Sequence, residues 1–233
     1  SFSVTAEEEN FTSETDYLQQ VEKGINHCQQ GDCIHVVLSR SFERNFKGDD
    51  FKVYRALRSI NPSPYLFYLD YNNFHLMGSS PEAQCKYANG KASLHPIAGT
   101  YMRTHDKKQD EEKAIALVND EKEKAEHTML VDLARNDLSK NFKNINIVAY
   151  KKIESYSHVI HLVSKIEGEG LLAKVDALQI LADSFPAGTL SGAPKPKAMQ
   201  IIKETETTNR GFYGGCVGFL GFDGSLNTAI MIR

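Results

Sequence analysis

The stretch that says most about the fold runs from residue 186 to residue 195 and reads PAGTLSGAPK. Its two glycines permit backbone conformations that other residues resist. Pro194 suits the first turn of a helix, and the apolar residues that follow it repeat at helical spacing. The pattern predicts a tight loop that opens onto a helix over residues 195–206. Such a helix start offers unpaired N–H groups to an anion, but Lys195 is followed by Pro196, which excludes a Walker A phosphate loop. An ordinary tight turn before a surface helix is the competing interpretation.

On both sides of this loop, helical and strand patterns alternate. We expect further helices over residues 14–30, 52–59, 110–133 and 175–184. We expect strands over residues 34–42, 65–71, 73–79, 82–88, 144–150 and 157–167, and a final hairpin of residues 215–222 and 226–233 that turns at Asp223-Gly224. Strands in series with interspersed helices predict an α+β fold whose sheets are mixed and largely antiparallel, with helices packed on them. We expect residues 1–233 to form one domain.

Composition narrows the classes of function. The 233 residues carry a formal net charge of -3, which gives no basic surface for nucleic acid or for acidic membranes. There is no apolar run long enough to span a bilayer and no signal-peptide pattern at the start. The four cysteines lack metal-type spacing, so free thiols in the cytoplasm are the simplest interpretation. We expect no nucleic-acid partner, no membrane association and a cytoplasmic location.

Two acidic side chains on the long predicted helix could hold a metal ion. Glu123 and Glu126 are three residues apart and therefore share a helix face. Paired carboxylates suit Mg²⁺, which takes one or two of them and completes its shell with water and ligand oxygens. Lys122 and Lys124 stand beside them, so a solvated acidic helix face is the competing interpretation.

The predicted strand over residues 157–167 carries two histidines. Because side chains alternate along a strand, His158 and His161 point to opposite faces and cannot bind one metal together. At most one of them faces a site. A buried core histidine among valines is the competing interpretation.

Five ordered segments resemble the chorismate-utilising enzymes, and most closely the anthranilate synthase component I family. They are PIAGT at residues 96–100, AEHTMLVDLARNDL at 125–138, YSHVIHLVS at 156–164, the loop at 186–195, and RGFYGG at 210–215. The resemblance runs from about Phe11 to Arg233. It implies a Mg²⁺-dependent reaction in which ammonia adds to chorismate at C2 and the C4 hydroxyl leaves. Pyruvate is then eliminated to give anthranilate.

The resemblance also implies roles for particular residues. Glu126 matches a Mg²⁺ ligand and Glu123 lies close behind it, while Gly99 and Thr100 match the backbone that meets the ring carboxylate. His161 matches the histidine associated with elimination.

Four more positions match the family's site. Glu82 matches the general acid for the departing hydroxyl, and Thr189 matches a loop residue that faces the ring. Tyr213 and Arg233 match groups that bind the enolpyruvyl carboxylate, a planar anion that suits a guanidinium. The competing interpretations are a surface glutamate at the start of a strand, a packed tyrosine and an ordinary surface arginine.

Two positions separate members of this family. Aminodeoxychorismate synthases typically have a nucleophilic lysine where Ala98 stands. Isochorismate synthases typically have a water-activating lysine where His35 stands, and anthranilate synthases usually have glutamine there. His35 could hydrogen-bond a nucleophile, or it could be structural.

The family's catalytic chain is longer than this one at both ends. We therefore expect residues 1–233 to lack an N-terminal part and a C-terminal segment that bears the second metal carboxylate. The resemblance implies ammonia supplied by a glutamine amidotransferase subunit. It also places part of a tryptophan feedback site near Asn61–Tyr65. Two alternatives remain open. The chain could carry out the reaction of aminodeoxychorismate synthase component I or of isochorismate synthase, or it could be a fragment that binds chorismate or a partner without catalysis.

Overall fold

The computed structural model describes residues 2–156 and 158–233. Its helices are α1 (Glu14–Gln29), α2 (Phe51–Ile60), α3 (Lys107–Asn119), α4 (Glu121–Ser139), α5 (Ala177–Ser184), α6 (Lys195–Thr205) and the short 3₁₀ turn η1 (Gly188–Leu190). The strands of the main sheet are β8 (Ala83–Ala88), β9 (Lys91–Leu94), β10 (Ile97–Met102), β11 (Phe142–Ser155), β12 (Val159–Leu171), β14 (Cys216–Leu220) and β15 (Leu226–Ile230). None of the described helices is long and apolar enough to cross a membrane.

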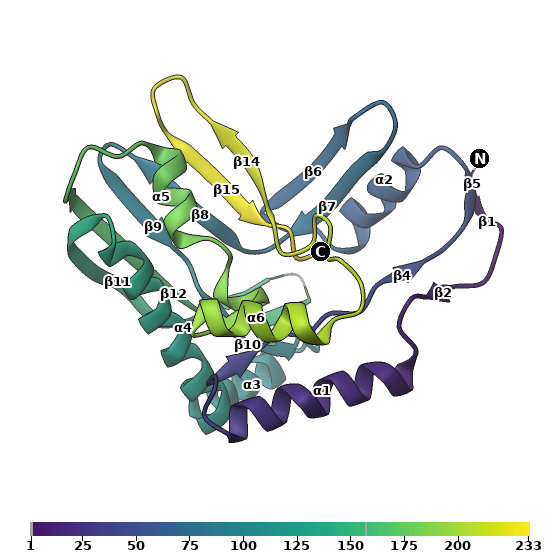
Figure 1. The fold of residues 1–233 in the computed structure, drawn as a ribbon, viewed down its shortest axis with the longest axis horizontal. Coiled ribbons are helices and arrows are strands. Elements are labelled where there is room, and N and C mark those ends of the chain that lie inside the picture. Colours follow the sequence, from purple (N-terminus) through teal and green to yellow (C-terminus); the bar gives the residue numbers. More distant parts are fainter. Residues whose placement is uncertain (1, 157) are drawn as a thin grey trace.

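The main sheet has seven strands in the order β10-β12-β9-β8-β15-β14, with β11 added along β12 (Figure 1). Every pairing within it is antiparallel. The long strand β12 organises it, because it pairs with β11 on one side and with β10 and β9 in succession on the other. This confirms the predicted α+β fold with largely antiparallel sheets.

The remaining strands form small two-stranded sheets. They are β1 (Phe2–Val4) with β5 (Phe46–Gly48), β2 (Glu9–Asn10) with β4 (Phe42–Glu43), β3 (His35–Val36) with β13 (Gly192–Ala193), and β6 (Tyr65–Asp70) with β7 (His75–Ser80). We call residues 51–80, which hold α2, β6 and β7, the β6–β7 arm. In Figure 1 this arm and the β14–β15 hairpin diverge from a common region near the C-terminus.

Helix α4 packs on the sheet and defines the main core. Val131, Ala134 and Leu138 on its inner face join Ile166 of β12 and Ile180 of α5 in one buried apolar cluster. A second buried cluster joins Leu117 of α3 to Ile160 and Leu162 of β12. Both helices thus lie against the strand that carries the YSHVIHLVS segment, which brings distant sequence motifs together.

One predicted helix is two helices in the structure. The prediction of a single helix over residues 110–133 is wrong, because the chain bends at Asp120, whose backbone is extended (φ -68°, ψ 114°). The Asp120 carboxylate accepts a hydrogen bond from the Glu123 N–H at 3.1 Å, so it caps the start of α4. Glu123 therefore lies in the first turn of α4 and Glu126 in the turn that follows.

Two strand predictions also need correction. The predicted strand over residues 34–42 contains only β3 and the first residue of β4. The expected meander from β6 through β8 is broken after β7: Pro81 cannot donate a ladder hydrogen bond, and β8 instead pairs with β9 and β15. Strands β9 and β10 were not expected. The predicted start of β12 at residue 157 lies outside the described residues.

Candidate active site

A glycine bulge at the end of β10 shapes one wall of the site. The β10–β12 register shifts between Ala98 and Thr100, so Gly99 forms a bulge, with φ +77°. A Cβ at Gly99 would lie 3.2 Å from the Glu123 Oε2 atom. The bare backbone of Gly99 and the start of α4 therefore lie in contact, with the Glu123 side chain beside this segment.

His161 of β12 is held beside the bulge. Its Nδ1 atom lies 3.0 Å from the Thr100 Oγ1 atom and 3.1 Å from the Gly99 carbonyl oxygen. Because a carbonyl oxygen only accepts, Nδ1 carries the proton when it bonds to Gly99, and Nε2 is left with a lone pair. Burial lowers the pKa of His161, which keeps the ring neutral. Its Nε2 atom has no hydrogen-bond partner among the described residues.

The other strand histidine lies elsewhere. The His158 Nε2 atom meets the carbonyl oxygen of Ile60 at 3.0 Å, on the β6–β7 arm. The two histidines thus bond to different segments, which is consistent with the predicted opposite faces.

Glu82 is a buried carboxyl group just before β8. It is only 5 % exposed, which rules out a surface glutamate. Burial raises its pKa to about 8, although the Ile97 backbone, the Thr189 hydroxyl and the charge of Arg233 act in the opposite direction. The Thr189 Oγ1 donates to the Glu82 Oε1 at 3.4 Å. At neutral pH Glu82 therefore carries a proton, within reach of the loop of residues 186–195.

Glu123 and Glu126 form an acidic pair on the first turns of α4. Burial raises the pKa of Glu123, and the neighbouring charges of Glu126 and Asp120 raise it further. Burial also lowers the pKa of His35, and the negative charge of Glu126 opposes that shift. Glu126 of α4 and His35 of β3 are therefore close enough for their charges to interact.

These two carboxylates suit a magnesium ion. Within residues 2–156 and 158–233 no three His, Cys, Asp or Glu side chains are grouped so as to hold a metal by themselves. Mg²⁺ does not need such a cage, because one or two carboxylates, water and substrate oxygens satisfy it. Two neighbouring carboxylates, of which Glu123 lies beside the bare backbone of Gly99, fit that requirement.

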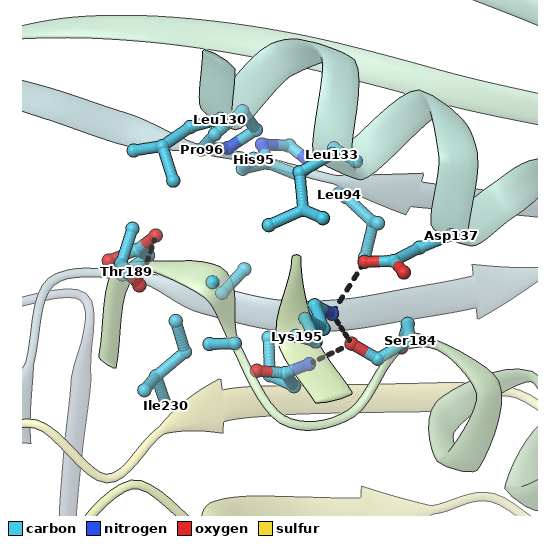
Figure 2. Close-up of a pocket in the computed structure, with 16 residues that line it drawn as sticks. Leu94, His95, Pro96, Leu130, Leu133, Asp137, Ser184, Thr189, Lys195 and Ile230 are labelled. Carbon is cyan, nitrogen blue, oxygen red and sulfur yellow. Dashed lines mark hydrogen bonds and ion pairs between the residues drawn. The ribbon is translucent and has the colours of Figure 1, made fainter. Parts of the chain in front are cut away.

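A cavity of about 50 Å³ extends from Glu82 and Thr189 toward a buried ion pair (Figure 2). Leu130 and Leu133 of α4 line one side and Ile230 of β15 lines the other.

The ion pair closes the far end of this cavity. The Lys195 Nζ atom donates to the Asp137 Oδ2 and to the Ser184 carbonyl oxygen, both at 2.6 Å (Figure 2). It thereby ties α6 to α4 and to the end of α5. This pair was not expected from the sequence. A lysine in the first turn of a helix, where the helix dipole disfavours cations, was the signal that could have found it.

Of the predicted site residues, Glu82 and Thr189 line this cavity and the others do not, Tyr213 and Arg233 among them. Tyr213 packs against Arg210, whose guanidinium carbon is 5.7 Å from the ring centre. The Arg233 carbonyl oxygen accepts a hydrogen bond from the Ser79 N–H at 3.0 Å, which fixes its backbone beside β7. The positive charge of Arg233 acts on both Glu82 and His161.

Arg210 links two sides of the site and was not expected to do so. Its guanidinium donates to the carbonyl oxygens of Leu190 and Val37 and to the Glu206 carboxylate, each at 2.6 Å. Glu206 in turn accepts from the Ser39 N–H at 2.7 Å. The loop that carries Thr189 is thus fixed to the segment that follows β3.

The chain belongs to the family of chorismate binding enzymes, whose model matches residues 1–233. Among curated relatives it is similar to anthranilate synthase component 1 of Aquifex aeolicus, with 47% identity over 226 residues that cover 96% of this chain and 45% of the relative. The same protein of Bacillus subtilis is 45% identical over 219 residues, which cover 93% of this chain and 42% of the relative. The chain thus spans a little under half the length of these relatives.

Solved structures show the same fold. Anthranilate synthase component I from Streptococcus pneumoniae superimposes with a TM-score of 0.90 and 37% identity, over 97% of this chain and 50% of that one. The menaquinone-specific isochorismate synthase MenF from Escherichia coli also gives a TM-score of 0.90, at 23% identity. That second likeness establishes the architecture alone.

Proposed function

We propose that residues 1–233 form catalytic machinery of an anthranilate synthase component I. The reaction is Mg²⁺-dependent addition of ammonia to chorismate at C2 with loss of the C4 hydroxyl, followed by elimination of pyruvate to give anthranilate. The observation that carries the proposal is Glu82, a buried carboxyl group that keeps its proton near neutral pH. The similarity to relatives that bear this name supports it.

Glu82 acts as the general acid. A hydroxyl is a poor leaving group unless it receives a proton as its bond to carbon breaks, and a carboxyl with a pKa of about 8 still holds that proton at pH 7. The Thr189 hydroxyl, which donates to the Glu82 Oε1, keeps the carboxyl oriented toward the cavity.

His161 serves the elimination step. Its Nδ1 atom is held by Gly99 and Thr100, so the ring cannot turn freely. The Nε2 atom, which has a free lone pair, is the atom that can accept a proton. Neutral imidazole is the required form, and burial provides it.

Substrate carboxylates would be held at two places. The ring carboxylate would meet the backbone at Gly99 and Thr100, and Glu126 with Glu123 would hold the Mg²⁺ ion beside it. When bound, the metal supplies Lewis-acid stabilisation of negative charge. Tyr213 and Arg233 would bind the enolpyruvyl carboxylate, and the field of Arg233 at Glu82 and His161 is consistent with a place near the reacting atoms.

Residues 98 and 35 favour anthranilate over the products of related enzymes. Ala98 has no nucleophilic atom, which disfavours aminodeoxychorismate synthase component I. His35 is partly buried, which lowers its pKa, and it is not the lysine typical of isochorismate synthases.

The proposal includes a partner and a regulator. A glutamine amidotransferase subunit would supply ammonia in the cytoplasm. Tryptophan would bind near Asn61–Tyr65 as a feedback inhibitor. Asn61 ends α2, and its carbonyl oxygen accepts from the Ser79 hydroxyl, so that turn is tied to β7, a few residues from Glu82.

Product analysis tests the proposal. Residues 1–233 replace the matching segment of the Aquifex aeolicus relative, and the chimera receives chorismate, ammonium and Mg²⁺, with the intact relative as control. We expect anthranilate and pyruvate by chromatography, and no product without Mg²⁺. If isochorismate or 4-amino-4-deoxychorismate dominates, the assignment is wrong. A folded chimera that binds chorismate without turnover would support a binding module instead.

A further inference from the structure

Two cysteine thiols meet at the carboxyl end of α1. The Sγ atoms of Cys28, in the last turn of the helix, and Cys33, in the loop before β3, lie 3.4 Å apart. Cys33 is only 3 % exposed, whereas Cys28 remains partly accessible to solvent. The reaction proposed above uses neither of them.

The turn between the two cysteines is firmly held. Gly31 adopts φ +82°, which lets the helix end tightly, and its N–H donates to the Cys28 carbonyl oxygen at 3.1 Å. Across the same turn the His27 Nδ1 pairs with the Asp32 carboxylate at 2.7 Å. Lys197 of α6 reaches the same carboxylate at 3.7 Å. The thiol contact is therefore set by a hydrogen-bonded turn and not by a free loop.

These thiols are not part of a metal site. The described residues contain no group of three His, Cys, Asp or Glu side chains placed to hold a metal ion. His27 and Asp32 are engaged with each other. What remains is a pair of thiols in contact, and the chemistry open to such a pair is disulfide formation.

We propose that Cys28 and Cys33 form a reversible intramolecular disulfide when the protein meets hydrogen peroxide. The Cys28 sulfur attacks one peroxide oxygen, the O–O bond breaks, and the products are a sulfenic acid on Cys28 and one water. The Cys33 sulfur then attacks the Cys28 sulfur, and the hydroxyl leaves as a second water with the Cys33 proton. The two thiols lose two electrons, which the peroxide gains.

Exposure assigns the order of attack. Cys28 meets solvent first. Burial raises the pKa of Cys33 to about 11, and its hydrogen bond with Cys28 acts in the same direction, which keeps it a thiol until the sulfenic acid forms next to it. In a reducing cytoplasm the pair stays reduced, so the disulfide marks exposure to oxidant.

Oxidation would reach the candidate active site through one short segment. The Sγ atoms of Cys28 and Cys33 are 3.4 Å apart, and a disulfide bond is roughly 2 Å long, so the loop must shift slightly when the bond forms. Two residues further on, His35 begins β3, and the Ile34 N–H donates to the Ala193 carbonyl oxygen at 2.8 Å. The disulfide would therefore fix the end of α1 to the strand that supports the 186–195 loop.

The test uses residues 1–233 as a purified, fully reduced protein. Hydrogen peroxide is added and then removed with catalase, free thiols are alkylated under denaturing conditions, and the protein is digested. Trypsin leaves both cysteines in the peptide 24–40, and further cleavage before Asp32 separates them unless a disulfide joins them. We expect the joined peptides, lighter by two hydrogen atoms, and their release by dithiothreitol. We also expect a higher melting temperature for the oxidised protein.

Single substitutions test the order of the steps. Cys33→Ser should leave a sulfenic acid on Cys28 that reacts with dimedone, whereas Cys28→Ser should leave Cys33 unmodified. Cys216→Ser is the matched control and should still form the disulfide. Four alkylated thiols in the peroxide-treated wild type would overturn the proposal, as would disulfides between molecules only. The peptide map of the peroxide-treated wild type decides whether the Cys28–Cys33 disulfide forms, even if a variant fails to fold.

Discussion

At the scale of single residues, burial changes Glu82 in the way that matters most for catalysis, because it raises the pKa of this carboxyl group to about 8. Replacing it with glutamine keeps the shape but removes the proton that the departing hydroxyl needs. In the chimera, Glu82→Gln should lower kcat by about 10²- to 10⁴-fold. The wild-type rate should fall as the pH rises through about 8, where the acid form is lost. The exposed Glu204→Gln is the control. A glutamine variant with normal kcat would remove Glu82 from the mechanism.

His161 offers a second test at the same scale. If its free Nε2 serves only elimination, His161→Met in the chimera should still consume chorismate and release the aminated enolpyruvyl intermediate in place of anthranilate. The reason is that the two half-reactions move different protons. Mass analysis of the products and a melting curve of the variant check this. A structural role predicts a lower melting temperature and equal loss of both steps, without the intermediate.

At the scale of elements, the bulge at Gly99 is the joint between β10 and the start of α4. Gly99→Ala would force a side chain into φ +77°, with its Cβ 2.9 Å from the Leu117 Cδ1 and 3.2 Å from the Glu123 Oε2. We expect a loss of about 1–2 kcal/mol from the backbone alone, plus the cost of displacing Glu123.

Urea denaturation measures this loss. Gly90→Ala is the matched control, because Gly90 has φ +75° and a Cβ there would have no neighbour within 4 Å. Equal destabilisation of the two variants would show that the contact between Gly99 and Glu123 carries no cost.

Helices were the elements that sequence predicted best, because their signals are local. The boundaries of α1 follow from Ser13 as its cap and from Gly31 just beyond its end. Strand pairing was harder, since β8 meets β15 across more than a hundred residues and nothing local marks that partner. The same limit applies to the site. Motif residues such as Glu82 were found, whereas the Lys195–Asp137 pair and the contacts of Arg210 depend on which segments fold together.

At the scale of the whole molecule, buried titratable groups should set how stability varies with pH. Burial lowers the pKa of His127 and His95 to about 4 from the ordinary 6.5. Between those values the unfolded chain binds protons that the folded chain does not, so stability falls as the pH drops. Glu82 acts oppositely: the folded chain keeps its proton from the ordinary 4.5 up to about 8, so stability falls as the pH rises through that window.

Melting temperatures across pH 4–9 check these signs. We expect the melting temperature to fall at both the acidic and the alkaline end of this range. Each group contributes up to about 3–5 kcal/mol to the free energy of unfolding by linkage. Glu82→Gln should flatten the alkaline side and His127→Gln the acidic side. An unchanged profile in either variant would assign that limb to other groups.

The β6–β7 arm has a consequence for how the molecule opens. Among the described residues none from 34 to 77 is buried, and the arm contributes no side chain to the three apolar clusters. Its ties to the rest include the Ser79 to Arg233 backbone bond, the Tyr65 hydroxyl on Asn227 and the His158 contact at Ile60. Because none of these buried apolar clusters holds the arm, we expect it to separate from the main sheet as one unit. Amide hydrogens of β6 and β7 should therefore exchange with solvent while those of β12 stay protected. The arm would then open and close many times before the main sheet unfolds once.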